Sequence, residues 1–209
     1  MKHYRVGMVT TAIAAVMVLA QSASAQLLES WEGSLDGWTV QNANYIYAPA
    51  TKFGVTDGTF SASLTGLAGP NYGQMLLSPY EASWTAEIGG ATSMSLDVYT
   101  PNASFGYYCQ FQLGLVNNDT GYVALNPVYT GTGIGSETTI TVPISPSVAA
   151  TLAASSNPTQ LFIQIGGGYT AGNETMYLDN LRVVPEPSTF ALLGFGVLGL
   201  VGVARRRRS

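Results

Sequence analysis

The sequence has very little histidine and cysteine, and each shortage excludes a class of function. Its single histidine, His3, lies at the start of the chain. The remainder therefore has no imidazole for a Ser-His-Asp or Cys-His nucleophilic site, or for the usual catalytic zinc site. Cys109 is the only cysteine, which excludes an internal disulfide. We expect Cys109 to pack as a small buried hydrophobic residue, with an intermolecular disulfide as the alternative.

Positive charge is scarce between the two ends of the chain. Of the eight Lys and Arg residues, only Lys52 and Arg182 lie within residues 26–187, which hold all twelve acidic residues, so this span carries a net charge of −10. A domain this acidic is not expected to bind nucleic acid, because binding requires positive charge that neutralises phosphates. It suits an exported protein that stays soluble, and it favours binding of cations.

The first 25 residues are organised like a secretory signal peptide. Lys2 and Arg5 give a positive start, an uncharged run follows over residues 6–20, and Ala23 and Ala25 have the small-x-small spacing that signal peptidase accepts. We therefore predict a signal helix within residues 1–25 and cleavage after Ala25 by signal peptidase. The alternative is an uncleaved anchor helix, which the short apolar run disfavours.

Residues 26–184 predict a single all-β domain, because short segments rich in Tyr, Thr, Val and Ile alternate with Gly, Pro, Asn and Asp turns. Strands at this spacing predict a jelly-roll β-sandwich of two antiparallel sheets. One short helix is predicted at Pro146–Ala154, with Ser145 as its N-cap. The predicted strands are Leu27–Trp31, Trp38–Val40, Tyr45–Ala48, Phe60–Leu67, Gln74–Ser78, Ser93–Tyr99, Tyr107–Val116, Gly121–Leu125, Thr138–Ile144, Leu161–Gly166 and Thr175–Val184.

Alternation in three predicted strands separates an aliphatic face from a face of aromatic, amide and carboxylate side chains. The aliphatic faces are expected to meet in the core. Sugars bind to aromatic rings beside planar polar groups, so the opposite residues predict a glycan-binding face. They are Asp97, Tyr99, Tyr108, Gln110, Gln112 and Gln164, and the loop residues Tyr72, Tyr80, Trp84, Tyr129 and Tyr169 are candidates to extend the face. The alternative is a face covered by the helix and loops, or an ordinary solvated sheet surface.

Three short stretches resemble carbohydrate-binding modules of the galactose-binding-like jelly-roll kind. "SWEGSLDGWTV" resembles their opening strand, "TDGTFSASLTG" the next strand and "MYLDNLRVV" the closing strand. The resemblance implies a structural calcium held by the side chains of Glu32 and Asp179 and by backbone carbonyls near Thr59 and Ser61, a mixed ligation that calcium accepts. The alternative is that Glu32 and Asp179 are surface turn residues that hydrogen-bond locally.

Residues 185–209 combine Pro185–Glu186–Pro187, an uncharged run and the cluster Arg205, Arg206, Arg207 and Arg208. The run predicts a transmembrane helix over residues 189–204, and the arginines predict a cytoplasmic C-terminus. Within the run, the 15 residues Phe190–Ala204 span about 22 Å as a helix, against roughly 30 Å of hydrocarbon, so the helix is a marginal span. This order resembles the PEP-CTERM sorting signal, which implies processing by an exosortase at or near the Pro-Glu-Pro triplet. Related tails are also described as ice-binding-protein C-terminal domains, a name for the tail rather than for ice binding.

These features predict an exported bacterial protein that passes through an inner-membrane-anchored precursor to the cell surface or extracellular matrix. Its β-sandwich is expected to bind glycan or exopolysaccharide, and a purely structural matrix or adhesion protein is the alternative. A small glycosidase that uses two carboxylates is a further alternative. Its candidate residues, Asp97, Glu81, Glu87 and Glu137, are chosen by residue type alone, so we expect a binding or structural module rather than an enzyme.

Overall fold

In the computed structural model of the 209-residue chain, the residues that can be described lie within Ala25–Pro185. The predicted signal helix and the predicted transmembrane helix at 189–204 lie outside the described residues. Within the part that is described, no helix is both long and apolar enough to cross a membrane. The described residues are 25–41, 46–50, 53–67, 74–101, 110–125, 128–129, 135–166 and 174–185.

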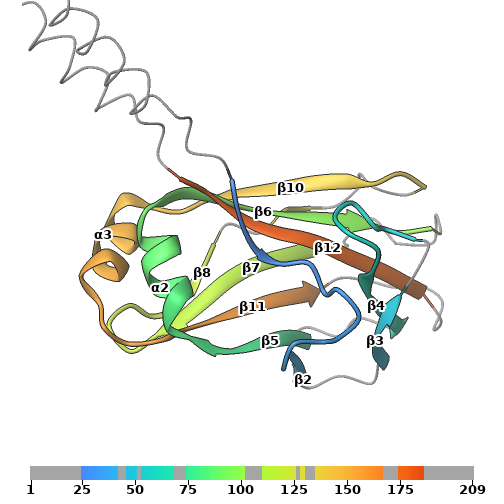
Figure 1. Ribbon diagram of the computed structural model, residues 1–209, viewed down its shortest axis with the longest axis horizontal. Helices are drawn as coiled ribbons and strands as arrows, with labels where there is room; N and C mark the ends of the chain where they lie inside the picture. The colour runs from blue at the N-terminus through green and yellow to red at the C-terminus, as the bar shows by residue number, and fades with distance from the viewer. Residues whose placement is uncertain are drawn as a thin grey trace, which may run out of the picture. The chain divides into compact units, whose positions relative to one another are not determined.

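The described part of the chain is a sandwich of two antiparallel sheets (Figure 1), which confirms the predicted fold class. The first sheet has the order β10-β6-β12-β4-β3, with β1 beside β12, and the second has the order β2-β5-β11-β7-β8, with β9 beside β7. The first sheet consists of β1 (Gln26–Glu29), β3 (Ile46–Ala50), β4 (Ser61–Leu67), β6 (Ala91–Tyr99), β10 (Thr138–Pro143) and β12 (Glu174–Pro185). The second consists of β2 (Thr39–Gln41), β5 (Gln74–Glu81), β7 (Gln110–Asn117), β8 (Gly121–Ala124), β9 (Val128–Tyr129) and β11 (Thr159–Gly166).

Each predicted strand overlaps an observed one, with ends that differ by up to three residues. The predicted helix is confirmed as α3 (Pro146–Ala154), and the hydroxyl of Ser145 accepts a hydrogen bond from the Val148 N–H at 3.3 Å, as expected for an N-cap. The helix α2 (Ala82–Gly89) was not predicted. It lacks a side-chain cap at Glu81, and Gly89 lies directly against the backbone of Ala153 in α3, so tertiary packing rather than a local signal places it.

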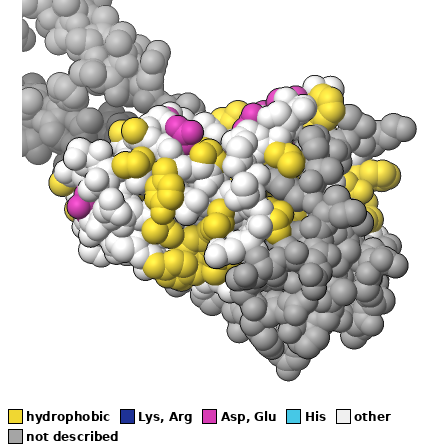
Figure 2. All heavy atoms as spheres, turned by 90° about the horizontal axis from the view of Figure 1, so that it is seen from below, with side chains coloured by type: hydrophobic (Ala, Val, Ile, Leu, Met, Phe, Trp, Pro, Cys, Tyr) yellow, Lys and Arg dark blue, Asp and Glu magenta, His cyan; other side chains and the backbone are white. Residues whose placement is uncertain are grey.

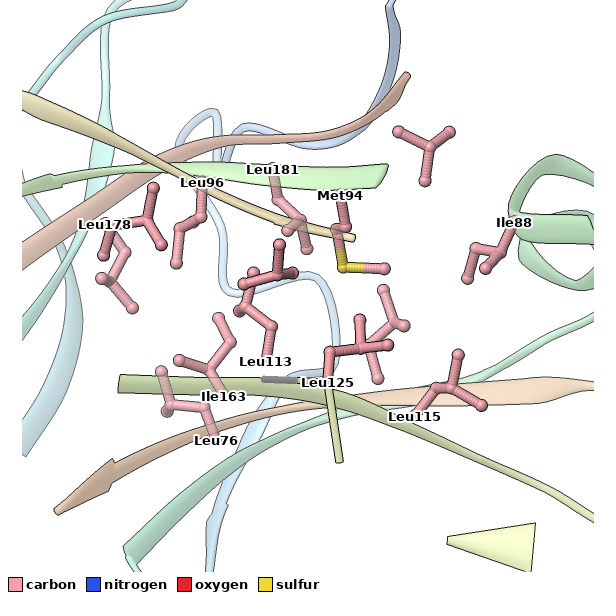
Figure 3. Close-up of a cluster of buried hydrophobic side chains, with 14 of the residues drawn as sticks. Leu76, Ile88, Met94, Leu96, Leu113, Leu115, Leu125, Ile163, Leu178 and Leu181 are labelled. Atoms are coloured by element: carbon pink, nitrogen blue, oxygen red, sulfur yellow. The ribbon is translucent and has the colours of Figure 1, made fainter. Parts of the chain in front are cut away.

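The core lies between the two sheets, where the aliphatic faces meet as predicted (Figure 3). Side chains of β6 and β12 point down from the first sheet, and side chains of β5, β7 and β11 point up from the second. Ile88 of α2 closes one end of this layer. Each fully buried aliphatic side chain contributes about 1.5–3 kcal/mol. The labelled residues are Leu76, Ile88, Met94, Leu96, Leu113, Leu115, Leu125, Ile163, Leu178 and Leu181.

Candidate functional site

The predicted glycan-binding residues do not share one face. Asp97 and Tyr99 belong to β6 in the first sheet, whereas Gln112 in β7 and Gln164 in β11 belong to the second. Because each set points away from the core, the two sets lie on opposite sides of the sandwich. The prediction of a single face is therefore wrong in this respect: alternation tells inside from outside, but it does not tell which sheet a strand joins.

The outer face of the second sheet can be reconstructed from the strand register, because residues paired across antiparallel strands point to the same side. Buried neighbours such as Leu113 and Ile163 point to the core, so the residues between them point outward. Three rows result. They are Gln41–Met75–Gln164–Gln112, Thr39–Leu77–Phe162–Gly114–Ala124 and Tyr80–Gln160–Val116–Tyr122.

An aromatic stack stands at the centre of this face. The ring of Phe162 lies flat over Gly114, where an added Cβ would overlap it. Tyr122 stacks on Phe162 with ring centroids 4.6 Å apart and ring planes within 12°. Phe162 is buried, whereas Tyr122 is 54% exposed, so the tyrosine presents ring surface to solvent. A flat, fixed aromatic ring is the usual platform for a sugar ring.

Amide and apolar side chains surround the stack. Gln112 and Gln164 are cross-strand neighbours in the adjoining row, and both are partly exposed. Tyr80, which is also exposed, lies in the row of Tyr122 with two strands between them, about 14 Å across the sheet. No residue of the three rows is charged. Figure 2, seen from the side on which β5 and β11 lie, shows hydrophobic side chains gathered among uncharged ones, with acidic side chains toward the margins.

The other predicted glycan contacts have varied positions. Tyr108, Tyr72 and Tyr169 lie outside the described residues, as does Cys109, and Gln110 and Tyr129 are described by their backbone alone. Trp84 is buried against Trp38, with ring centroids 6.2 Å apart, so it belongs to the core. Sequence reasoning missed Tyr122. An exposed tyrosine beside a tight turn carries no marker, and its stacking partner is 40 positions away.

The outer face of the first sheet holds a buried polar network around Asp97. Its carboxylate accepts hydrogen bonds from the Thr139 hydroxyl at 2.5 Å, the Thr56 hydroxyl at 2.7 Å and the Asn180 amide at 2.7 Å. Burial alone would raise the pKa of Asp97, but these three hydrogen bonds, together with the positive charge of Arg182, outweigh it and lower the pKa. A glycosidase acid needs the opposite shift.

Of the remaining glycosidase candidates, two lie on other elements and only Glu137 shares the sheet face of Asp97. Glu81 ends β5 in the second sheet and Glu87 lies in α2, whereas Glu137 precedes β10 in the first sheet. Burial raises the pKa of Glu87. Glu137 lies on the same face as Asp97, but the carboxylate of Asp97 is occupied by three hydrogen-bond donors, so these two residues do not form a pair of free carboxylates.

Glu32 and Asp179, the predicted calcium ligands, both accept hydrogen bonds from the backbone of residues 56–60. Asp179 is fully buried and accepts hydrogen bonds from the backbone N–H groups of Thr56 and Asp57 at 2.6 and 2.8 Å. The exposed carboxylate of Glu32 accepts from the N–H groups of Thr59 and Phe60 at 2.9–3.1 Å. The two acids thus hold both ends of residues 56–60 through four backbone donors.

Calcium takes six to eight oxygens, and in this geometry the carboxylate oxygens of Glu32 and Asp179 already accept N–H groups, so calcium binding stays a prediction that would require the segment to rearrange. Among the described residues, no three His, Cys, Asp or Glu side chains gather in one place, which leaves the predicted mixed site of two carboxylates and backbone carbonyls untested. Ser61, near which a carbonyl ligand was predicted, is buried and donates its hydroxyl to the Phe53 carbonyl at 2.7 Å. Burial raises the pKa of Asp179, while hydrogen bonds lower that of Glu32.

The two tryptophans of the opening motif are core residues. Trp31 and Trp38 meet edge to face with centroids 5.5 Å apart, and both are buried. The Trp38 indole N–H donates to Glu29 at 3.2 Å, whereas the Trp31 indole N–H has no hydrogen-bond partner. Trp31 also has a left-handed backbone, with φ of 52°. The two tryptophans therefore belong to the core and do not form a binding surface.

The two predicted processing points lie on neighbouring strands. Ala25, the residue before the predicted signal peptidase cut, is exposed and directly precedes β1. Gln26 of β1 pairs with Val183 of β12, two residues before Pro185. Pro185 is itself part of the sheet and pairs with Ala91 of β6. Glu186, Pro187 and the four arginines lie outside the described residues.

Comparison with known proteins finds a family match for the tail and solved structures with a similar fold for the sandwich. Residues 183–208 match the family model described as the PEP-CTERM protein-sorting motif. None of the curated protein sequences compared with the chain matches it. One similar structure is described as the basis for the promiscuous specificity of carbohydrate-binding modules from the β-sandwich superfamily. Its TM-score is 0.56 at 18% identity over 78% of this chain, and the match spans 62% of that chain.

Two further similar structures are complete modules. The CBM27-1 module of Caldicellulosiruptor saccharolyticus, in complex with mannohexaose, has a TM-score of 0.53 at 17% identity, covering 78% of this chain and 98% of its own. The C-terminal family 22 module of Clostridium thermocellum Xyn10B has a TM-score of 0.51 at 11% identity, covering 80% and 96%. The chain thus carries a PEP-CTERM protein-sorting motif at residues 183–208, preceded by a β-sandwich with the fold of carbohydrate-binding modules.

Proposed function

We propose that this protein is an exported surface or matrix protein whose β-sandwich binds a glycan on the outer face of the second sheet. The observation that carries the proposal is the stack of Tyr122 on Phe162, beside the neighbouring amides of Gln112 and Gln164 on an uncharged surface. A sugar ring stacks on an aromatic face while its hydroxyls bond to planar amides. The shared fold with carbohydrate-binding modules supports this use of the sheet.

The ligand we propose is an uncharged polysaccharide rather than a single sugar. The three rows of the face have no charged side chain, and the net charge of −10 over residues 26–187 repels an acidic polymer. The span of about 14 Å between Tyr80 and Tyr122 is longer than one sugar ring. An exopolysaccharide of the producing cell is therefore the proposed partner.

The tail carries the second half of the proposal. A PEP-CTERM motif implies that an exosortase recognises residues 183–208 and cuts at or near Pro185–Glu186–Pro187. The predicted helix at 189–204 then acts as a temporary anchor of an inner-membrane precursor, after signal peptidase has removed residues 1–25. The intact mass of the released protein reports both cuts at once, and a mass that retains the arginine cluster contradicts this part of the proposal.

Affinity electrophoresis in gels that contain neutral polysaccharides tests the glycan site. We expect retardation of the wild-type protein and its loss in Tyr122→Ala, because the platform is removed. Phe53→Ala is the matched control, since Phe53 has a similar exposure, 49% against 54%, but belongs to the opposite side of the sandwich. Equal retardation of wild type and Tyr122→Ala contradicts the proposed site. Absence of any retardation favours the alternative of a purely structural matrix or adhesion protein.

A further inference from the structure

The outer face of the first sheet has a hollow of about 330 Å³, which the proposed glycan site does not use. We call it the Glu137 hollow. The segment before β4, the end of β6 and the approach to β10 form it, and the N–H of Gly135 donates to the Thr100 carbonyl at 2.9 Å, which joins the last two. Its lining residues are Phe53, Gly54, Tyr99, Gly135, Ser136 and Glu137.

An aromatic cluster forms the wall of the Glu137 hollow. Phe53 and Tyr99 have ring planes within 10° and centroids 6.4 Å apart, and Tyr177 lies 6.0 Å from Tyr99 and 5.6 Å from Phe53. Gly54 fits so closely that an added Cβ would overlap Tyr177, which fixes the segment that carries Phe53. Phe53 is nevertheless 49% exposed. A fixed aromatic side chain at the surface is preorganised for a ligand.

Charge distinguishes this hollow from the face of the second sheet. Glu137 is exposed, and no described residue forms a hydrogen bond or ion pair with its carboxylate. Asp97 lies on the same face two residues before Tyr99, and its carboxylate is occupied by its own three donors. Arg182 is the only Lys or Arg among the described residues, and its Nε donates to Asn180 at 2.8 Å rather than to Glu137.

An aromatic wall beside a free carboxylate, in a domain of strong negative charge, attracts a cation that also has a ring or apolar body. We propose that the Glu137 hollow binds a protonated amino sugar, with the sugar ring against Phe53 and Tyr99 and the ammonium group on Glu137. This site goes beyond the proposed neutral-glycan site and does not depend on it. A domain with both sites bridges a neutral polysaccharide and an amino-bearing one on its two opposite faces.

The test is calorimetric titration of the full chain in detergent, in mildly acidic buffer that keeps the amines of a chitosan oligosaccharide protonated, with that oligosaccharide and with the N-acetylated oligomer of the same length. We expect binding of the chitosan oligosaccharide and none, or far weaker, of the N-acetylated one. Glu137→Gln should weaken binding about ten-fold, because a charge-assisted hydrogen bond is lost. Phe53→Ala should abolish binding, while Tyr122→Ala should leave it unchanged.

Glu81→Gln is the matched charge control, because it removes the same charge from the second sheet. An equal loss in Glu81→Gln and Glu137→Gln means that the chitosan oligosaccharide is held by net charge alone, and overturns the site. Equal affinity for the N-acetylated oligomer, or for an oligolysine of equal charge, also overturns it. Failure of the neutral-polysaccharide test with intact chitosan binding removes the proposed function and leaves this inference standing.

Discussion

Replacing Asp97 by asparagine tests whether the negative charge of this hydrogen-bond acceptor stabilises the fold at the outer face of the first sheet. The carboxylate accepts from three side chains of three different segments, at 2.5–2.7 Å. Hydrogen bonds to charged groups contribute about 1.5–3 kcal/mol, against about 0.5–1.5 kcal/mol for neutral ones. Because asparagine keeps one oxygen, and the Thr139 hydroxyl can turn to accept from the new amide, we expect a loss of about 2–3 kcal/mol near neutral pH, or roughly 5–10 °C in Tm.

The loss should depend on pH in a defined direction. The folded-state pKa of Asp97 is lowered, so its contribution is present above the unfolded-state pKa of about 3.9 and disappears as the pH falls through the lower folded-state value. Asparagine does not titrate. The difference in unfolding free energy between wild type and Asp97→Asn should therefore be largest near neutral pH and shrink in strong acid.

Urea unfolding followed by tryptophan fluorescence measures this difference, because Trp31, Trp38 and Trp84 are all buried. Glu81→Gln is the control. It removes one exposed carboxylate for which no hydrogen bond is found among the described residues, so it should shift stability by less than about 0.5 kcal/mol. A difference between wild type and Asp97→Asn that stays constant with pH, or is absent at neutral pH, refutes the reasoning.

Three further outcomes follow from close contacts. Gly114→Ala should destabilise the protein by about 1–3 kcal/mol and weaken retardation by neutral polysaccharide, because its Cβ displaces Phe162; unchanged melting and binding contradict the stacked geometry. Ser145→Ala should lower the free energy of unfolding by about 1 kcal/mol in thermal unfolding, because the N-cap hydrogen bond is lost; an unchanged free energy of unfolding would contradict a stabilising N-cap. Calcium or a chelator should leave the Tm unchanged, because the oxygens of Glu32 and Asp179 already accept backbone N–H groups; a rise with calcium would show that the segment rearranges into the predicted site.

Sequence periodicity was sufficient to predict the strands and their inner faces. Met94 and Leu96 alternate with polar residues in a single run, so their burial follows from local pattern alone. The helix α3 could also be predicted from the sequence, since Ser145 and Pro146 mark its start. These features depend on residues that are close in the chain.

The sequence pattern could not predict which strands pair with each other. Gln112 and Asp97 both lie between apolar residues along their strands, so their sequence patterns look the same. However, β7 pairs with β11 and β6 pairs with β12, and no local sequence signal distinguishes these partners. The stack of Tyr122 on Phe162 also depends on two pairings, through β7 to β11. The resemblance located Glu32 and Asp179 as important positions, yet their hydrogen-bond partners at residues 56–60 became visible only in the folded chain.

The pairing of β1 with β12 makes the folded unit suitable for circular permutation. Ala25 directly precedes β1 and Pro185 ends β12, and these two strands lie side by side (Figure 1), about 5 Å apart at Gln26 and Val183. A linker of a few residues is therefore long enough to join the two ends, and new ends can be opened in a surface turn away from both proposed sites. A circularly permuted sandwich of this kind would keep both outer faces while carrying neither of its original ends.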